Sequence, residues 1–146
     1  MAKDDTVWTR PGVSGDWKKI DGEFNNVAVG ADGRVWGVTR DDIIWTRPGV
    51  SGDWKKIDGA LKEISVGADG RVWGVAKDDT IWTRPGVSGT WQKIDGGLNQ
   101  VSVGSDGRVW GVAKDDTIWT RPGVSGTWQK IDGALIWVSA AAVKAE

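Results

Sequence analysis

The sequence predicts an all-β fold built from four copies of one unit, each copy a small antiparallel sheet. The segment Trp-Thr-Arg-Pro-Gly-Val-Ser-Gly begins at Trp8, Trp45, Trp82 and Trp119, always 37 residues apart. Each copy holds four apolar runs of four or five residues, rich in Val, Ile, Thr and Trp. Such runs suit strands and are too short for helices. Turn-forming pairs such as Asp-Gly separate them, which is a strong hairpin signal.

The same period organises the twelve tryptophans of the chain. A second series is Trp17, Trp54, Trp91 and Trp128, and a third is Trp36, Trp73 and Trp110. Only Trp137 lies outside the three series. We therefore treat residues 1–146 as a single unit of four repeats, 2–38, 39–75, 76–112 and 113–146, with the last one shortened.

The third repeat shows the order of elements most clearly. Its expected strands are 80–84, 90–94, 100–103 and 108–112. The turns between them carry Pro-Gly-Val-Ser-Gly, Asp-Gly-Gly and Ser-Asp-Gly. Four up-and-down strands in about forty residues describe a blade of a β-propeller. A solenoid with one or two strands per turn fits less well.

The chain starts and stops in the middle of a blade. If Val27-Ala28-Val29 is an innermost strand, residues 7–10 form a third strand and residues 17–20 a fourth. Residues 137–139 then form an innermost strand, and Ala142–Ala145 could serve as a weak second strand. The terminal blade would be completed by both termini of one chain or by another chain, which removes free sheet edges. A homo-oligomer is thus one of two expected assemblies.

Composition excludes several classes of function. With no Cys and no His, the chain offers no disulfide, no thiol nucleophile and no imidazole for a triad. A formal net charge of −1 gives no general attraction to nucleic acid. No apolar run approaches the ~20 residues of a membrane span, and the first residues resemble no secretory signal. We expect a soluble protein without membrane insertion, of unknown compartment.

Pairs of aspartates recur with the repeat at Asp41-Asp42, Asp78-Asp79 and Asp115-Asp116. A catalytic carboxylate pair is needed only once, and the spacing of a calcium loop is absent. We interpret the pairs as turn residues whose side chains bind nearby backbone. No metal site, no cofactor and no catalytic residue is expected.

The repeat resembles the tectonin repeat, found in tachylectin-type and fish-egg lectins and in fungal tectonins. The resemblance rests on Val-Trp-Gly-Val, an Asp-rich turn, Ile-Trp-Thr-Arg-Pro and Trp-Gln-Lys-Ile-Asp-Gly in this order, over nearly the whole chain. It implies a propeller that binds sugars. Two departures are the four repeats where the family usually has six, and Trp at a position where the family often has Tyr.

The candidate sugar-binding residues are the tryptophans that flank the Arg-Pro-Gly loop, together with its arginines. An indole can stack on the apolar face of a sugar while a guanidinium donates hydrogen bonds to hydroxyls. The candidates are Trp8, Arg10, Trp17, Trp45, Arg47, Trp54, Trp82, Arg84, Trp91, Trp119, Arg121 and Trp128. The competing interpretation is packing between blades, which we expect for Trp36, Trp73 and Trp110 and which also applies to the others.

Three functional hypotheses remain open. The first is a non-enzymatic, multivalent lectin for glycans, of the N-acetylglucosamine type or from microbial surfaces. The second is a structural or protein-interaction scaffold. The third is an engineered repeat protein without native function, which the near-identity of the copies favours. An enzyme is not expected, because no nucleophile–base pair and no phosphate loop is present.

Overall fold

A computed structural model describes residues 4–11 and 13–139, and every regular element in this part of the chain is a β-strand. The strands are β1 (Thr6–Thr9), β2 (Lys18–Glu23), β3 (Asn26–Val29), β4 (Val35–Val38), β5 (Ile43–Arg47), β6 (Lys55–Ala60), β7 (Glu63–Val66), β8 (Val72–Val75), β9 (Ile81–Arg84), β10 (Gln92–Ile94), β11 (Gln100–Val103), β12 (Val109–Val112), β13 (Ile118–Arg121) and β14 (Gln129–Ile131).

The strands form three four-stranded sheets and one two-stranded sheet, all with neighbours antiparallel. We call β3–β6 blade 1, β7–β10 blade 2 and β11–β14 blade 3. In each blade the strands lie side by side in chain order. The pair β1 and β2 forms an N-terminal half-blade, which occupies the third and fourth strand positions of a blade. The predicted all-β propeller architecture, with a start in mid-blade, is confirmed.

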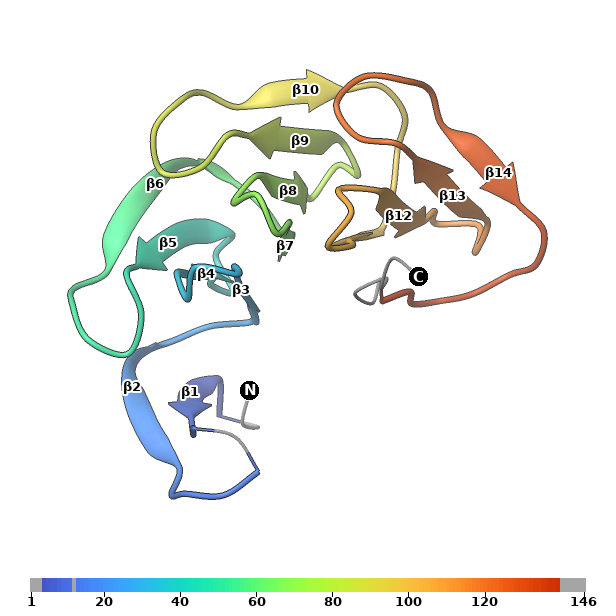
Figure 1. Cartoon of the computed structure of the whole chain (residues 1–146). Coiled ribbons are helices and arrows are strands. Elements are labelled where there is room, and N and C mark those ends of the chain that lie inside the picture. The colour runs from blue at the N-terminus through green and yellow to red at the C-terminus, as the bar shows by residue number, and fades with distance from the viewer. Residues whose placement is uncertain (1–3, 12, 140–146) are drawn as a thin grey trace.

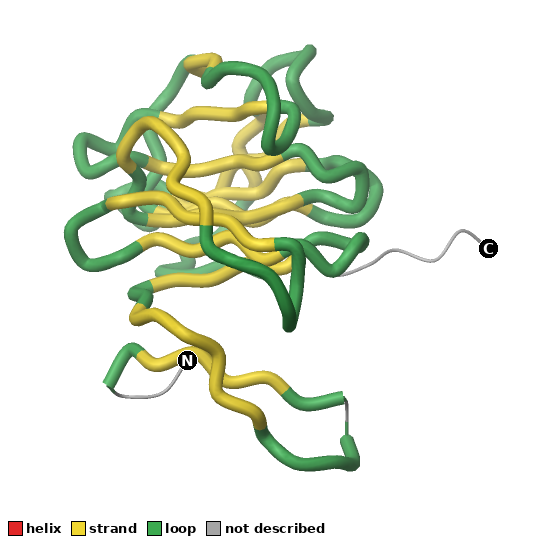
Figure 2. Tube along the Cα trace, turned by 90° about the vertical axis from the view of Figure 1, so that its left-hand side faces the viewer, coloured by secondary structure: helices red, strands yellow, loops and turns green. Residues whose placement is uncertain are grey.

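The blades follow one another along an arc, with β3 and β7 near its centre and β6, β10 and β14 on its outside (Figure 1). The inner strands of neighbouring blades contact each other, β3 with β7 and β7 with β11. Figure 2 shows the same stack from the side, with the N-terminal half-blade at one end. The two ends of the arc do not meet (Figure 1).

The apolar core lies between successive blades. All four residues of β8 are buried because blades cover both faces of this strand. Trp36 and Trp73 are each only 1% exposed, and they pack against residues of the following blade such as Ile64 and Val101. Trp110 holds the same position in blade 3 and is half-buried, because no described blade follows it. Core packing is thus confirmed for two members of this series and is partial for the third.

The paired aspartates shape the turn between the second and third strands. Asp42, Asp79 and Asp116 adopt φ angles of 67°, 70° and 70°, the left-handed region that Asp tolerates better than most residues. The backbone carbonyl of Asp79 accepts the N–H of Leu98 at 3.0 Å, which anchors the loop that leads to the next blade. The interpretation of these pairs as turn residues is confirmed.

Residues 137–139, expected as an inner strand, form no regular strand, because no later strand pairs with them within the described residues. They still lie beside β11, the inner strand of blade 3, where the inner strand of a following blade is expected. The backbone N–H of Val138 donates to the Gln100 side chain at 2.8 Å, and the Gln100 amide donates to the Val138 carbonyl at 2.7 Å. The expected strand over Ala142–Ala145 lies outside the described residues. Over the described ranges, no helix has the length and apolar character needed to cross a membrane.

Candidate functional site

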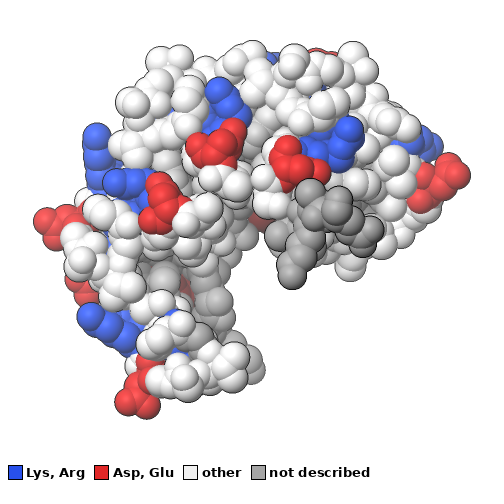
Figure 3. Space-filling model, viewed as in Figure 1, with Lys and Arg blue, Asp and Glu red and all other residues white. Residues whose placement is uncertain are grey.

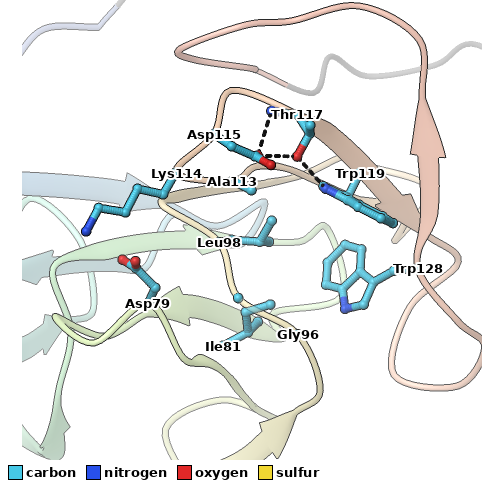
Figure 4. A pocket seen from close by; sticks show the side chains of 11 residues that line it. Asp79, Ile81, Gly96, Leu98, Ala113, Lys114, Asp115, Thr117, Trp119 and Trp128 are labelled. Carbon is cyan, nitrogen blue, oxygen red and sulfur yellow. Dashed lines mark hydrogen bonds between the residues drawn. The ribbon is translucent and has the colours of Figure 1, made fainter.

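An open pocket lies between blades 2 and 3, with a volume of about 470 Å³. This size is within the range of small-molecule sites. Blade 2 contributes its β9 strand, the Asp-Gly-Gly turn and the connection to blade 3, whereas blade 3 contributes the Lys-Asp-Asp-Thr turn and two tryptophans (Figure 4). The lining residues are Asp79, Ile81, Gly96, Gly97, Leu98, Ala113, Lys114, Asp115, Thr117, Trp119 and Trp128.

The same pocket recurs one period earlier, between blades 1 and 2, with a volume of about 360 Å³. Its lining is Asp42, Gly59, Ala60, Leu61, Ala76, Lys77, Asp78, Thr80, Trp82 and Trp91. Every one of these residues lies 37 positions before a residue that lines the first pocket. The pocket is therefore a property of the blade interface and not of one repeat.

One wall of each pocket is a pair of indoles, and hydrogen bonds hold the first of them. The indole Nε1 of Trp119 donates to Thr117 Oγ1 at 2.8 Å, and Thr117 Oγ1 donates to Asp115 Oδ1 at 2.5 Å (Figure 4). The hydroxyl and backbone N–H of Thr117 lower the pKa of the Asp115 carboxyl, since both favour its charged form. The pocket rim therefore carries a fixed carboxylate beside an aromatic face.

The second indole is oriented by the preceding blade and by an arginine. Trp128 Nε1 donates to the backbone carbonyl of Asp95 at 2.7 Å. The Arg121 guanidinium lies 5.2 Å from the centre of the Trp128 ring, within cation–π range. The equivalent bond in the other pocket joins Trp91 Nε1 to the Asp58 carbonyl at 2.6 Å. Both indoles are thus held in place without a ligand.

The arginines occupy a different position from the one expected for sugar donors. Arg47, Arg84 and Arg121 are 6%, 3% and 3% exposed. Arg84 donates to the loop carbonyls of Gly86 at 2.7 Å and of Val87 and Gly89 at 2.9 Å. Burial and these bonds occupy the guanidinium, so it acts as a clamp on the Arg-Pro-Gly loop. The Nε and Nη2 groups of all three arginines donate to loop carbonyls, which directs the guanidinium toward its own loop.

Charged side chains form the opposite end of the pocket. Lys114 and Asp79 point toward each other across it (Figure 4). Asp79 also pairs with Lys62, whose Nζ lies 2.6 Å from Asp79 Oδ1. Figure 3 shows basic and acidic side chains side by side on this face over successive blades. A ligand with an apolar face and several hydroxyl or amide groups would match an indole wall that faces these polar groups.

The interface between the N-terminal half-blade and blade 1 differs from the other two. Phe24 takes the place of Leu61 and Leu98, and its ring lies 4.6 Å from the Trp54 ring, measured between centroids. Ile43 stands where the other interfaces have a threonine, so the Asp–Thr–Trp hydrogen-bond chain is not formed by Trp45. This interface is packed more with aromatic and aliphatic side chains.

The structure brings together some of the residues expected to bind a ligand and separates others. Trp82 with Trp91 and Trp119 with Trp128 pair in the two pockets. Trp45 and Trp54 pack against the apolar cluster around Phe24. Trp8 and Trp17 lie on the N-terminal half-blade and are 45% and 60% exposed. Sequence reasoning missed the lysine, aspartate and threonine of the Lys-Asp-Asp-Thr turn as pocket residues, although their exact repetition beside the tryptophans was a usable signal.

No group of three or more acidic side chains that could hold a metal ion occurs in residues 4–11 and 13–139. The described lining of the pockets consists of aromatic, aliphatic, hydroxyl and charged side chains.

Comparison with known proteins agrees with this geometry. The model of the tectonin domain matches residues 1–145. No curated protein matches the chain. Many solved structures share its fold, and one of them is the computationally designed Ika8 protein, with 20% identity and a TM-score of 0.67 over 95% of this chain and 47% of that one.

Two further structures of the same fold match at lower sequence identity. YCF48 bound to a peptide has 17% identity and a TM-score of 0.61 over 87% of this chain and 48% of that one. Prp20p from Saccharomyces cerevisiae has 12% identity and a TM-score of 0.63 over 87% of this chain and 44% of that one. This chain thus spans about half the length of the structures that it matches. With the family model covering almost the whole sequence, and with blades of the matching architecture, the chain belongs to the tectonin family.

Proposed function

We propose that this protein is a non-enzymatic lectin that binds glycans in the pockets between its blades. The observation that carries the proposal is the repetition of one pocket at a period of 37 residues, each copy with two fixed indoles and a fixed carboxylate. The lectin members of the family that this repeat resembles support the same assignment.

The chemistry of a sugar ring fits the pocket in two respects. Its C–H face can lie on an indole, where burial of apolar surface contributes roughly 25 cal/mol per Å². Its hydroxyl groups can donate to the Asp115 carboxylate and accept from the Lys114 ammonium at the pocket rim. Because hydrogen bonds already hold Trp119 and Trp128, little side-chain freedom is lost on binding.

Each pocket is open and shallow, so single-site affinity will be low. Several equivalent pockets on one rigid arc convert weak single sites into strong binding of a surface that displays many copies of a sugar. Multivalent glycans of the N-acetylglucosamine type or of microbial surfaces are the proposed partners.

A protein-interaction scaffold is the second candidate. Two structures of the same fold are described as bound to a peptide or as binding Gsp1p and histones, and at 17% and 12% identity they support the fold only. The paired indoles with a carboxylate favour a sugar over an extended peptide, because an indole face and a charged rim match a ring with one apolar face and several hydroxyl groups.

The test is a broad glycan array followed by calorimetric titration of N-acetylglucosamine oligomers. We expect binding that persists in a chelator, because the pocket linings offer an indole wall and charged side chains rather than a cluster of carboxylates. Trp82→Ala and Trp119→Ala should each remove about half of the binding through the two described pockets, and the double variant should remove all of it. Lys55→Ala, an exposed change outside both pockets, is the matched control.

The proposal fails if no glycan binds, or if the double variant binds as the unaltered chain does. Loss of binding on addition of chelator would contradict its metal-free part. Unchanged circular dichroism of the variants must accompany the result, so that a folding defect is not mistaken for a lost contact. Capture of a peptide at the same pockets, without any glycan, would favour the scaffold.

A further inference from the structure

The two ends of the arc expose the two separate halves of one blade interface. Within the chain, each blade has one face toward the blade that follows it, here called its trailing face, and one toward the blade before it, the leading face. The trailing face of each blade packs on the leading face of the next. At the C-terminal end, Leu135 is 43% exposed, whereas Leu61 and Leu98 at the same position are each 2% exposed. At the N-terminal end, Trp8 and Trp17 are 45% and 60% exposed, whereas Trp119 and Trp128 are half-buried.

The exposed halves carry the residues of the pocket. On blade 3, Asp116, Ile118, Gly133 and Leu135 lie one period after Asp79, Ile81, Gly96 and Leu98. On the N-terminal half-blade, Asp4, Thr6, Trp8 and Trp17 lie three periods before Asp115, Thr117, Trp119 and Trp128. Both halves thus match the lining of the pocket between blades 2 and 3.

The N-terminal half is also preorganised in the same way. Trp8 Nε1 donates to Thr6 Oγ1 at 2.9 Å, and Thr6 Oγ1 donates to Asp4 Oδ1 at 2.5 Å. This hydrogen-bond chain is absent from the interface behind Trp45, where Ile43 replaces the threonine. The exposed face of the half-blade therefore carries the same hydrogen-bond chain as the pocket faces of blades 2 and 3.

From this match we propose that a second copy of the chain places its N-terminal half-blade on the trailing face of blade 3, so that two copies form one ring. Each of the two junctions then completes a further pocket of the kind described above. The assembly itself does not depend on sugar binding. The assignment of the junction as a glycan site rests on the proposed function.

The contacts between blades predict the anchors of the junction. Trp128 donates to the Asp95 carbonyl, and Arg121 Nη1 lies 3.3 Å from Asp95 Oδ1. One period later the acceptor is Asp132, which is exposed. Trp17 and Arg10 of the second copy hold the donor positions, and Arg10 already lies 5.2 Å from the centre of the Trp17 ring.

Two copies are expected rather than one because of the opening of the arc. The chain superposes on 47%, 48% and 44% of the lengths of three longer chains of the same fold, so its curvature is that of about half a larger structure. The ends lie apart in the single chain (Figure 1), and the space-filling view shows a wide opening between them (Figure 3). Among the described strands, β1 pairs only with β2, whereas β5, β9 and β13 pair on both edges, so the half-blade has an edge that a partner can cover.

The experiment is sedimentation of the 146-residue chain without sugar, over a range of concentrations. We expect one species at twice the chain mass of 15.7 kDa. Leu135→Asp and Trp17→Asp should each give a species of 15.7 kDa with unchanged circular dichroism, because both side chains are exposed in the single chain. Lys55→Asp, at an exposed position on the outer strand β6 of blade 1 and away from both ends of the arc, should leave the mass doubled.

Mixing the two disabled variants tests the head-to-tail geometry. The Trp17→Asp copy keeps an intact blade 3 face, and the Leu135→Asp copy keeps an intact half-blade, so one sound junction can form and a double-mass species should reappear. If copies instead paired symmetrically through one end alone, mixing the two variants would not restore the double-mass species. That result would contradict the proposal.

If the unaltered chain sediments only as a 15.7 kDa species, the ring of two copies is overturned. A doubled mass that persists in the Leu135→Asp variant would also overturn it. A mass that keeps rising with concentration would mean an open chain of copies and would also overturn it. Calorimetry separates the ring from the glycan site: a doubled mass with no sugar binding removes the proposed function alone. If both hold, the unaltered chain should bind one more sugar per chain than Leu135→Asp.

Discussion

The indole of Trp128 donates a hydrogen bond to the backbone carbonyl of Asp95 in the preceding blade, over 2.7 Å. The same bond joins Trp91 to Asp58 and Trp54 to Asp21, each at 2.6 Å. One tryptophan in each blade therefore ties that blade to its neighbour and, in the two described pockets, lines the space between them. The residue that holds the arc together is also a wall of the candidate site.

Arg84→Ala is expected to destabilise the fold by about 2–3 kcal/mol. The change removes a buried guanidinium that holds three loop carbonyls, and it leaves those carbonyls without their donor. Urea unfolding at fixed protein concentration measures the loss, with the exposed Arg40→Ala as the control. An unchanged free energy of unfolding for Arg84→Ala would show that the clamp contributes nothing.

Trp73→Ala should cost about 3–5 kcal/mol of unfolding free energy. The indole is 1% exposed and fills the space between blades 2 and 3, so its removal leaves a cavity. Trp110→Ala should cost less, because blade 3 leaves that equivalent side chain half-buried. Equal losses for the two variants would contradict the described packing.

Gly74→Ala should destabilise by about 1–3 kcal/mol through overpacking. A Cβ atom at this position would lie 2.3 Å from Leu61 Cδ1 and 2.9 Å from the backbone oxygen of Glu63. The repeats supply a matched control in Gly97→Ala, since the preceding repeat has Ala60 there and the nearest atom to an added Cβ is 3.7 Å away. Thermal melts of the two variants should differ, and similar melting temperatures would contradict the close approach at Gly74.

Glu63→Gln should stabilise the protein at neutral pH, by roughly 0.5–1 kcal/mol because the site is only partly buried. Burial raises the pKa of Glu63, so its charged form is disfavoured in the folded state. The cost is present above the folded pKa and disappears as the pH falls below the ordinary glutamate value of about 4.3. A glutamine can also accept and donate at once, as Gln100 does toward Val138 at the same position one period later.

The measurement is the difference in unfolding free energy between the two proteins from pH 7 to pH 4. This difference should shrink as the pH falls. A difference that is constant with pH would assign the gain to hydrogen bonding alone and not to removal of a charge.

Thr117→Val should weaken sugar binding at one pocket while leaving the fold intact. The valine keeps the shape of the threonine and breaks the chain from Asp115 to Trp119. The Thr117 hydroxyl is the largest of the contacts that lower the pKa of Asp115, so its loss moves that pKa up although the backbone N–H bond remains, and the acid loss of binding should begin at a higher pH. Titration of sugar from pH 7 to pH 3 tests this shift, with Thr9→Val on β1 as a control outside the two described pockets.

Much of the fold could be predicted because strand length, turn chemistry and period all agree. The start in mid-blade followed from the order of the runs around Trp8 and Trp17. The burial of Trp36 and Trp73 followed from their position on an inner strand. The half-buried state of Trp110 could not be read from the repeat, because it depends on which blade follows and not on local sequence.

The site could be predicted only in part, because it lies between repeats. Trp119 and Trp128 belong to one repeat, and their partners Ile81 and Leu98 belong to another. A repeat considered alone places Arg121 beside Trp128 and suggests a sugar donor. The fold turns that arginine inward, where the loop carbonyls of Gly123 and Val124 accept its hydrogen bonds.

The central claim is that glycans bind between the blades, and the indole N–H resonances in a nitrogen–proton correlation spectrum report on it directly. On titration with N-acetylglucosamine oligomers, we expect the signals of Trp82, Trp91, Trp119 and Trp128 to shift and to saturate together, while those of Trp36 and Trp73 stay in place. Signals are assigned by single Trp→Phe variants. Saturable shifts that spare all four pocket indoles, or no shifts with any sugar, would contradict the account.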